Sequence, residues 1–302
     1  MTNDYKATIP AVNTRNEIIN NIIFFSLSLY HLFTSSFVNI KSYKCTQFKS
    51  GGMLTDSSMD IASPSRKLAD LFLWNLPWNN IKKELGGKLY LLDIGCGSGT
   101  YCQRFRMLSH DNISSYFGLD VMHNKGWEVL TKKYPNSSFG VYDGVNIKEI
   151  IPNDINIIIS YSTLEHVKHD ISLLNSIDEY IRKTNRDIIQ IHLFPSLAGI
   201  ITFGKHGFRQ YSQKTIEVLS SIFRDNSYST LYKLGSAYSI LLHILYISLP
   251  RLFLRRDLRD YECFKYPEIS RKVLEHDIKK PFVVAPSFYA LVIHSNYKNR
   301  IF

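Results

Sequence analysis

A short apolar run followed at once by a glycine-rich turn constrains the fold of this chain most. Leu89–Ile94 is apolar apart from Tyr90 and the acid Asp93, and it leads into a turn with glycines at 95, 97 and 99. Such a run is typical of a strand that is buried on both faces of a sheet. Glycines after it allow a sharp turn into a helix, whose first backbone N–H groups can face a ligand. We therefore expect an α/β sheet with a binding site where its first strand ends.

Strand and helix patterns alternate through the middle of the chain, which favours crossover connections and a parallel sheet. The expected strands are 89–94, 115–120, 138–142, 155–160, 187–193, 228–234 and 288–295. Ser63 followed by Pro64 predicts the N-cap and first turn of a helix that runs to Leu76. A second helix is expected with Asp170 as its N-cap, because apolar residues recur after it at helical spacing.

The composition is that of a globular protein with a core. Hydrophobic residues make up 45% and charged residues 21%, which excludes a disordered protein or a coiled coil.

The four cysteines form no CxxC pair, so a disulfide framework and a zinc ribbon are excluded and a cytoplasmic location is expected. The net charge of +10 is spread thinly along the chain, so nucleic acid is not the expected partner.

The spacing of the glycines distinguishes this turn from a dinucleotide-binding fingerprint. GxGxxG would place its third glycine at position 100, where this sequence has Thr100. An acid followed by GxGxG instead resembles motif I of the class I S-adenosylmethionine-dependent methyltransferases. Leu164–Val167, with the sequence Leu-Glu-His-Val, resembles the end of motif IV in the subgroup that includes ubiquinone-pathway, glycan and small-molecule methyltransferases. The resemblance covers roughly residues 89–295.

This resemblance implies a three-layer α/β/α, Rossmann-like fold. Its sheet would have seven strands, mostly parallel, with the last one antiparallel. The methyltransferase core would comprise residues 63–235, completed by a final strand within 287–302. Residues 1–62 would form a helical N-terminal extension and residues 236–286 a helical insertion, and both are expected to cap the acceptor pocket.

The resemblance also implies a site for S-adenosylmethionine (SAM) as the co-substrate. The acid and glycines of the turn would frame its methionine moiety. Asp120 ends the second strand, where a carboxylate can accept hydrogen bonds from both hydroxyls of a ribose. Asp143 follows the third strand and would lie near the adenine amine. The residues expected to bind SAM are Asp93, Gly95, Gly97, Gly99, Asp120, Asp143 and Ser160.

Histidines are the candidate catalytic bases of the acceptor site, because a hydroxyl acceptor with a high pKa needs a base. His166, just after the fourth strand, and His206, in a polar loop after the fifth, are the predicted catalytic residues; His192 is a further candidate base. In the same loop, Arg209 is suited to a carboxylate or phosphate and Tyr211 to a sugar or aromatic ring. The alternative is that these residues are structural.

No metal is expected. Metal-binding relatives of the Glu-His pattern have a second glutamate where this chain has Ser162, and one carboxylate with one histidine is a poor site for a hard cation.

The expected function is O-methylation of a small molecule or glycan intermediate. Two alternatives stay open: a non-catalytic SAM-fold binding or scaffold module, and an RNA methyltransferase. Amino-methylating nucleic-acid enzymes of this fold carry an Asn/Asp-Pro-Pro-aromatic motif after the fourth strand, where this chain reads Ser-Tyr-Ser-Thr over 160–163.

Two stretches bear on membrane contact. Residues 18–40 carry no charged side chain but include several polar ones, which favours helices docked on the main domain. Residues 238–249 are apolar and too short to span a membrane, and Arg251, Arg255 and Arg256 follow them within the segment 240–256. A buried cap over the pocket is the preferred interpretation, and a helix lying on an anionic membrane surface is the alternative.

Overall fold

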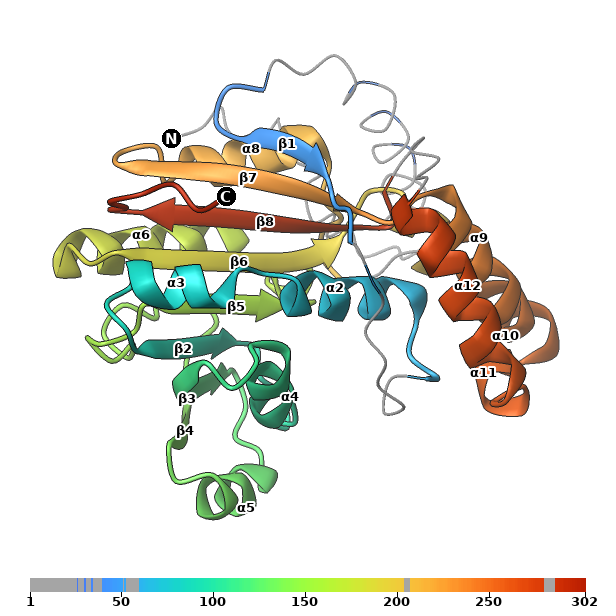
Figure 1. Ribbon diagram of the computed structural model, residues 1–302, viewed down its shortest axis with the longest axis horizontal. Helices are drawn as coiled ribbons and strands as arrows, with labels where there is room; N and C mark the ends of the chain where they lie inside the picture. The colour runs from blue at the N-terminus through green and yellow to red at the C-terminus, as the bar shows by residue number, and fades with distance from the viewer. Residues whose placement is uncertain are drawn as a thin grey trace, which may run out of the picture.

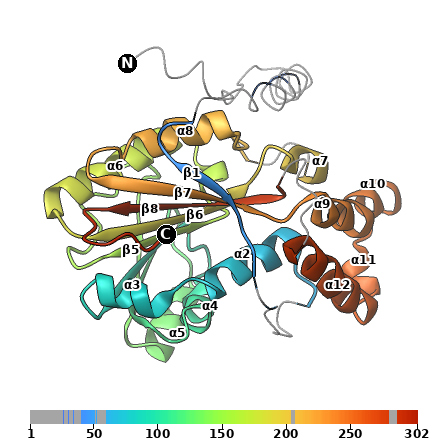
Figure 2. The same ribbon diagram turned by 45° about the horizontal axis from the view of Figure 1, so that its top comes forward.

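The computed structural model describes residues 40–50, 52, 60–203, 207–279 and 286–302, together with residues 26, 30 and 34. In this part of the chain an eight-stranded sheet has the order β1-β7-β8-β6-β5-β2-β3-β4 (Figures 1 and 2). Neighbouring strands are parallel, except that β8 is antiparallel to β6 and to β7. The strands are β1 (Lys44–Gln47), β2 (Leu89–Ile94), β3 (Ile113–Asp120), β4 (Ser137–Val141), β5 (Ile157–Tyr161), β6 (Ile188–Pro195), β7 (Ser227–Leu234) and β8 (Phe288–Ser295).

The predicted α/β fold with an antiparallel last strand is confirmed, but the sheet has eight strands and not seven. The additional strand, β1, comes from the N-terminal extension, for which only helices were expected, and it pairs with β7 at the edge of the sheet. Its four residues are exposed or half-buried. An edge strand of this kind lacks the apolar run that identifies a central strand in a sequence.

Helices cover both faces of the sheet (Figure 1). One core joins alternate strand residues such as Leu91 to α2, α3 and α4, and a second core joins residues such as Leu92 to α6 and α8. The helices are α2 (Pro64–Trp74), α3 (Trp78–Glu84), α4 (Tyr101–Leu108), α5 (Gly126–Lys133), α6 (Asp170–Thr184), α7 (Gly199–Phe203), α8 (Gln213–Ser221), α9 (Ala237–His243), α10 (Leu249–Leu254), α11 (Leu258–Tyr261) and α12 (Lys265–Lys279). Two short turns are the 3-10 turn η4 (Leu164–His166) and the π-helical turn η5 (Ile244–Ser248).

Of the two helix N-caps predicted from the sequence, one is confirmed and one is wrong. Ser63 caps α2 as expected, since its hydroxyl accepts a hydrogen bond from the backbone N–H of Arg66 at 3.4 Å. Asp170, in contrast, is the first residue of α6 and His169 is its N-cap. The carboxylate of Asp170 is buried and also binds two side chains of a later loop, which a local capping pattern does not reveal.

Between β7 and β8, residues 237–279 are largely helical and form an arm that projects beyond one end of the sheet (Figures 1 and 2). At its base α9 packs against α2, α7 and α12. The carboxylate of Asp277 in α12 accepts a hydrogen bond from the backbone N–H of Ser236 at 2.8 Å, which ties the two ends of the arm together. Most of the uncharged stretch 18–40 lies outside the described residues.

Candidate active site

The three glycines after β2 all have positive φ, at 77° for Gly95, 54° for Gly97 and 78° for Gly99, but for different reasons. A Cβ at Gly95 would lie 2.2 Å from the side chain of Thr163, and one at Gly99 would lie 2.6 Å from the ring of Phe139. A Cβ at Gly97 would meet no described atom within 4 Å. Gly95 and Gly99 are therefore required by packing, whereas Gly97 leaves a stretch of backbone open to a ligand.

Gly97 is held from two sides. Its backbone N–H donates to Asp120 Oδ2 at 2.8 Å, and its carbonyl accepts from the indole Nε1–H of Trp127 at 2.9 Å. The other oxygen of Asp120 accepts from the backbone N–H of Met122 at 3.3 Å. Each carboxylate oxygen has two lone pairs, so Asp120 keeps acceptor capacity for hydroxyl groups of a ligand.

Asp93 lies beneath the turn rather than on its open side. It is buried, and its Oδ2 accepts a hydrogen bond of 2.6 Å from the hydroxyl of Tyr116. Burial raises the pKa of Asp93 to about 7, against the opposing effect of the Tyr116 hydrogen bond. Asp93 is thus placed to orient the turn from below.

Asp143 and two apolar residues stand next to Asp120. Asp143 is exposed, and hydrogen bonds from the backbone N–H groups of Asn146 and Val145 lower its pKa. A Cβ at Gly144 would lie 3.4 Å from Val121, so the loop of Asp143 lies against the residue that follows Asp120. Val121 and Met122 are both exposed, Met122 to 73%.

Exposed apolar side chains beside two carboxylates form a shelf suited to a flat ring with a polar edge. Val121 and Met122 were not identified from the sequence. The available signal is that two apolar residues directly follow the acid that ends a strand.

Ser160, predicted to bind SAM, is fully buried inside the protein. Its hydroxyl lies 2.8 Å from Nδ1 of His192, whose Nε2 lies 3.2 Å from the side-chain oxygen of Gln190. Burial lowers the pKa of His192 to about 3, so this imidazole is neutral. The structure therefore uses Ser160 and His192 in an internal hydrogen-bond network, and His192 is not placed to act as a base on an acceptor.

A cavity of about 340 Å³ lies at the carboxyl ends of β5 and β6. It is next to the glycine turn, because Thr163, which packs on Gly95, belongs to the segment that lines it. The predicted base His166 is exposed at this cavity. The lining residues are Ser63, Ser65, Arg66, Ser162, Glu165, His166, Pro195 and Phe288. None of the described residues of the helical arm is among them, so the expected role of the arm as a cap finds no support here.

Glu165 is the most unusual residue of this cavity. It is 1% exposed, and its Oε2 has no hydrogen-bond partner among the described residues. Burial raises the pKa of Glu165 to about 8, so its carboxyl group is protonated at neutral pH. A buried polar atom without a partner costs about 1–3 kcal/mol, a cost that a polar ligand in the cavity would offset.

Arg66 supplies a cation at the cavity wall. Its Nη1 donates to the hydroxyl of Tyr101 at 2.7 Å, and its guanidinium lies 5.4 Å and 5.2 Å from the ring centres of Tyr101 and Tyr161. The hydroxyl of Tyr161 in turn donates to Asp70, which pairs with Arg104 at 2.7 Å. No sequence motif marks Arg66, since α2 reaches this cavity only through the tertiary fold.

The predicted acceptor residues of the loop after β6 are not in the cavity. Arg209 and Tyr211 are buried and both bind Asp170, with Arg209 Nε at 3.1 Å and the Tyr211 hydroxyl at 3.0 Å from its Oδ2. These contacts fix the loop to the start of α6, so the structure gives both residues an internal position. His206 lies outside the described residues.

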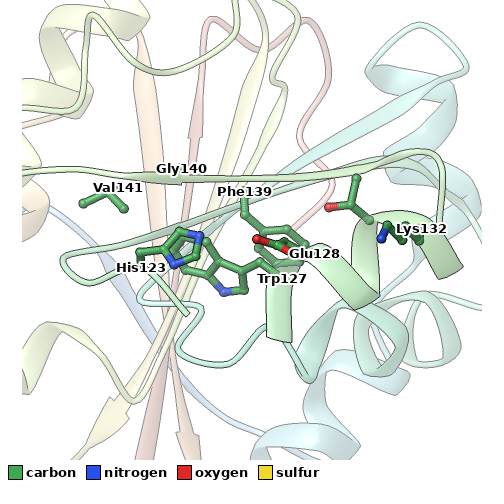
Figure 3. Close-up of a pocket in the computed structure, with 8 residues that line it drawn as sticks. His123, Trp127, Glu128, Lys132, Phe139, Gly140 and Val141 are labelled. Carbon is green, nitrogen blue, oxygen red and sulfur yellow. The ribbon is translucent and has the colours of Figure 1, made fainter. Parts of the chain in front are cut away.

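An open groove of about 590 Å³ lies on the other side of the turn, between α5 and the edge strand β4 (Figure 3). Trp127 stacks on Phe139 with ring centres 5.3 Å apart and an interplanar angle of 10°, and His123 lies with its edge against Trp127. Because Trp127 also binds the carbonyl of Gly97, this aromatic group supports the glycine turn from behind.

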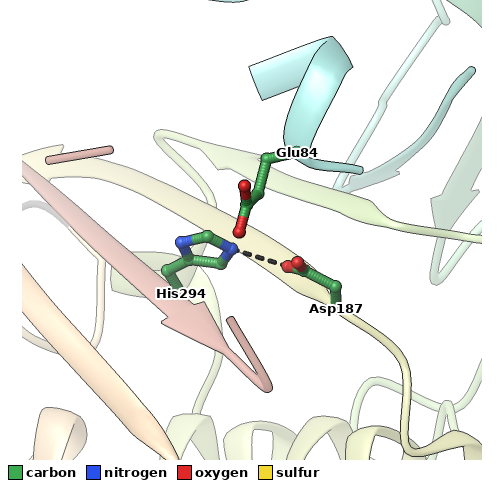
Figure 4. A group of neighbouring side chains, drawn as sticks. All are labelled: Glu84, Asp187 and His294. Carbon is green, nitrogen blue, oxygen red and sulfur yellow. Dashed lines mark hydrogen bonds and ion pairs between the residues drawn. The ribbon is translucent and has the colours of Figure 1, made fainter. Parts of the chain in front are cut away.

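A cluster of Glu84, Asp187 and His294 brings together groups of the kind that bind metals (Figure 4). Both ring nitrogens of His294 are engaged, Nε2 by Asp187 at 2.6 Å and Nδ1 by the hydroxyl of Tyr228 at 3.1 Å. Glu84 accepts hydrogen bonds from the C-terminal segment, including the backbone N–H of Lys298 at 3.0 Å. The cluster lies at the opposite end of the sheet from the glycine turn, and its contacts fasten the C-terminal segment to α3 and β6.

No protein-family model matches the chain, and no curated protein matches its sequence. Among solved structures, the plantazolicin methyltransferase BamL, in complex with a triazolic desmethylPZN analog and SAH, is 14% identical over 80% of this chain and 90% of its own, with a TM-score of 0.44. A SAM-dependent methyltransferase from Archaeoglobus fulgidus is 15% identical over 76% of this chain and 94% of its own, with a TM-score of 0.42. One from Aquifex aeolicus is 18% identical over 56% and 87%, with a TM-score of 0.35.

Proposed function

We propose that this protein is a SAM-dependent methyltransferase that binds SAM along the glycine turn and takes its acceptor into the cavity at Glu165 and His166. The observation that carries the proposal is the geometry of Gly97. Its backbone is open on one side, has a φ of 54°, and is hydrogen-bonded to Asp120 at the end of the neighbouring parallel strand. Open α/β sheets bind their ligands at this end of the strands.

The residues around Gly97 fit the parts of SAM. Asp120 has acceptor capacity for the two ribose hydroxyls, and Val121 with Met122 offers an exposed apolar shelf for the adenine ring. Asp143, on the adjoining loop, would accept a hydrogen bond from the adenine amine. Bound SAM would supply a methyl group on a sulfonium, which an acceptor atom takes by in-line displacement.

The cavity favours a polar acceptor with hydroxyl groups, such as a small molecule or a glycan intermediate. Ser63, Ser65 and Ser162 bring hydroxyls to its wall, and the protonated carboxyl of Glu165 can both donate and accept a hydrogen bond. Arg66 adds a positive charge for an anionic group of the acceptor. His166, exposed at the same cavity, would accept the proton of the hydroxyl that is methylated.

The direct test is transfer of tritiated methyl groups from labelled SAM to fractions of lysate metabolites and glycan precursors. Labelled product in a small-molecule or glycan fraction is the expected result. Binding of SAM without transfer to any fraction would favour the scaffold alternative. Label in RNA, together with an RNA affinity that falls steeply with salt, would favour the RNA methyltransferase.

A further inference from the structure

The helical arm carries an apolar face that none of the described residues covers. α9, η5 and α10 form one helical stretch, Ala237–Leu254, which is long and apolar enough to cross a membrane, with a hydropathy of 1.5. Only 28% of this stretch is buried. The buried side includes Leu242 and Ile247. Leu241, Leu245, Leu249 and Leu252 recur at helical spacing and are all exposed. A helix that is apolar on both sides needs a second partner.

At the far end of the arm, α10 is followed by α11 and the start of α12 (Figure 1). Large apolar side chains of this segment are also exposed. Phe253 is 75% exposed and Phe264 is 93% exposed, with the exposed ring of Tyr261 between them in sequence. Side chains of this size are rarely left in water in such numbers on one projecting element.

The charge next to this apolar end is positive. Residues 251–265 contain five basic and three acidic residues. One of the acids, Asp257, is paired with Arg251 and Arg259, each at 2.7 Å, and hydrogen bonds from Arg259 contribute most to lowering its pKa to about 2. Arg255 and Arg256 are exposed, and the guanidinium of Arg256 lies 5.1 Å from the ring centre of Tyr261.

We propose that the arm binds the surface of an anionic lipid bilayer. Phe253, Phe264 and the exposed leucines would enter the boundary between headgroups and acyl chains, and Arg255 and Arg256 would contact lipid phosphates. The arm lies on the membrane and does not span it, because the other side of α9 packs against α2, α7 and α12. Basic residues beside aromatic and aliphatic ones are the combination that binds such surfaces.

The test is flotation of the purified protein with phosphatidylcholine vesicles, with and without phosphatidylglycerol. The protein should float with the anionic vesicles, and raising the salt concentration should release it, because salt screens exposed charges. Failure to float with the anionic vesicles would overturn the proposal, and so would equal binding to the two compositions.

Two pairs of substitutions separate the charge from the apolar contact. Arg255→Gln with Arg256→Gln should weaken binding about fivefold for each arginine, whereas Lys83→Gln with Lys88→Gln, exposed lysines near α3, should leave it unchanged. Phe253→Ser with Phe264→Ser should abolish flotation without changing the melting temperature, because both side chains are exposed. Val129→Ser on α5, where the side chain is 66% exposed, is the control for the loss of an exposed apolar side chain outside the arm.

Wild-type flotation by the phenylalanine variant would contradict the proposal. If the wild-type protein is a dimer in solution, a monomeric phenylalanine variant that still floats would also contradict it, since the face would then be a contact between copies of this chain.

Discussion

The backbone N–H of Gly97 donates a hydrogen bond of 2.8 Å to the carboxylate of Asp120, which joins the glycine turn after β2 to the end of β3. Trp127 holds the carbonyl of the same residue from the side of α5. The open backbone at Gly97 is therefore fixed before any ligand arrives, and little conformational freedom remains to be lost on binding.

Gly97→Val should abolish SAM binding while the protein stays folded. The new side chain would occupy the space through which the ligand approaches, since no described atom lies within 4 Å of its Cβ. A β-branched residue is also strained at a φ of 54°, so the control must carry the same strain. Calorimetry with SAM and a melting curve measure the two effects. Gly86→Val is the matched control, since Gly86 also has a positive φ and an open Cβ position but lies before β2. Wild-type SAM affinity in Gly97→Val would remove the turn from the binding site.

Asp120→Ala should weaken SAM binding by about 1.5–3 kcal/mol, the contribution of hydrogen bonds to a charged group. The substitution also removes the acceptor that holds the N–H of Gly97. Binding is measured by calorimetry, with Asp154→Ala, at an exposed acid after α5 and β4, as the control. An unchanged affinity in Asp120→Ala would show that the ribose is held elsewhere.

His166→Ala should reduce turnover by about 10²–10⁴-fold and leave SAM affinity intact, if His166 is the general base. His169→Ala, at an exposed histidine on the same segment, is the control for the loss of an imidazole. If His206→Ala loses activity and His166→Ala keeps it, the base belongs to the loop after β6. If neither substitution has an effect, the acceptor ionises without a base and catalysis rests on positioning.

We expect activity to be lost at alkaline pH, because the buried carboxyl group of Glu165 ionises there. Its pKa is raised to about 8 by burial, so the protonated form dominates below that value and a buried, unpaired carboxylate appears above it. Turnover of the wild type should fall as the pH rises through about 8, and Glu165→Gln should lack this alkaline limb. The same alkaline limb in both proteins would assign the effect to another group.

The raised pKa of Glu165 also determines how the free energy of unfolding changes with pH. The folded-state pKa of Glu165 lies above its ordinary value of 4.5, so the folded state holds a proton that the unfolded state releases. This contribution to the free energy of unfolding is fully present below about pH 4.5 and is lost as the pH rises through about 8. Asp93, with a pKa raised to about 7, acts in the same direction. As the pH rises from about 4.5 to about 8, the melting temperature of Glu165→Gln should therefore fall less steeply than that of the wild type.

The elements that the sequence predicts best are those whose burial is two-sided. Leu89–Ile94 and Phe288–Ser295 have the bounds expected of them, because every second residue faces one core and the others face the second core. β1 escaped prediction, since an edge strand with partly exposed residues has no apolar run.

Some residues of the candidate site can be predicted from the sequence, and others are brought there only by the fold. The glycine turn and Asp120 follow directly from strand ends, so their positions are readable in the sequence. Arg66 and Trp127 reach the site only through contacts made in the folded chain. Arg209 was predicted to bind the acceptor but is buried in an ion pair with Asp170. The sequence of a polar loop does not reveal such a contact with a residue distant in sequence.

Calorimetric titration of the wild-type protein with SAM tests the central claim most directly. The geometry of Gly97 and Asp120 predicts saturable binding of one molecule per chain, and the product S-adenosylhomocysteine, which has the same ribose and adenine, should displace it. Absence of any binding heat with either ligand, from a protein whose melting curve shows it to be folded, would contradict the assignment of this turn to SAM.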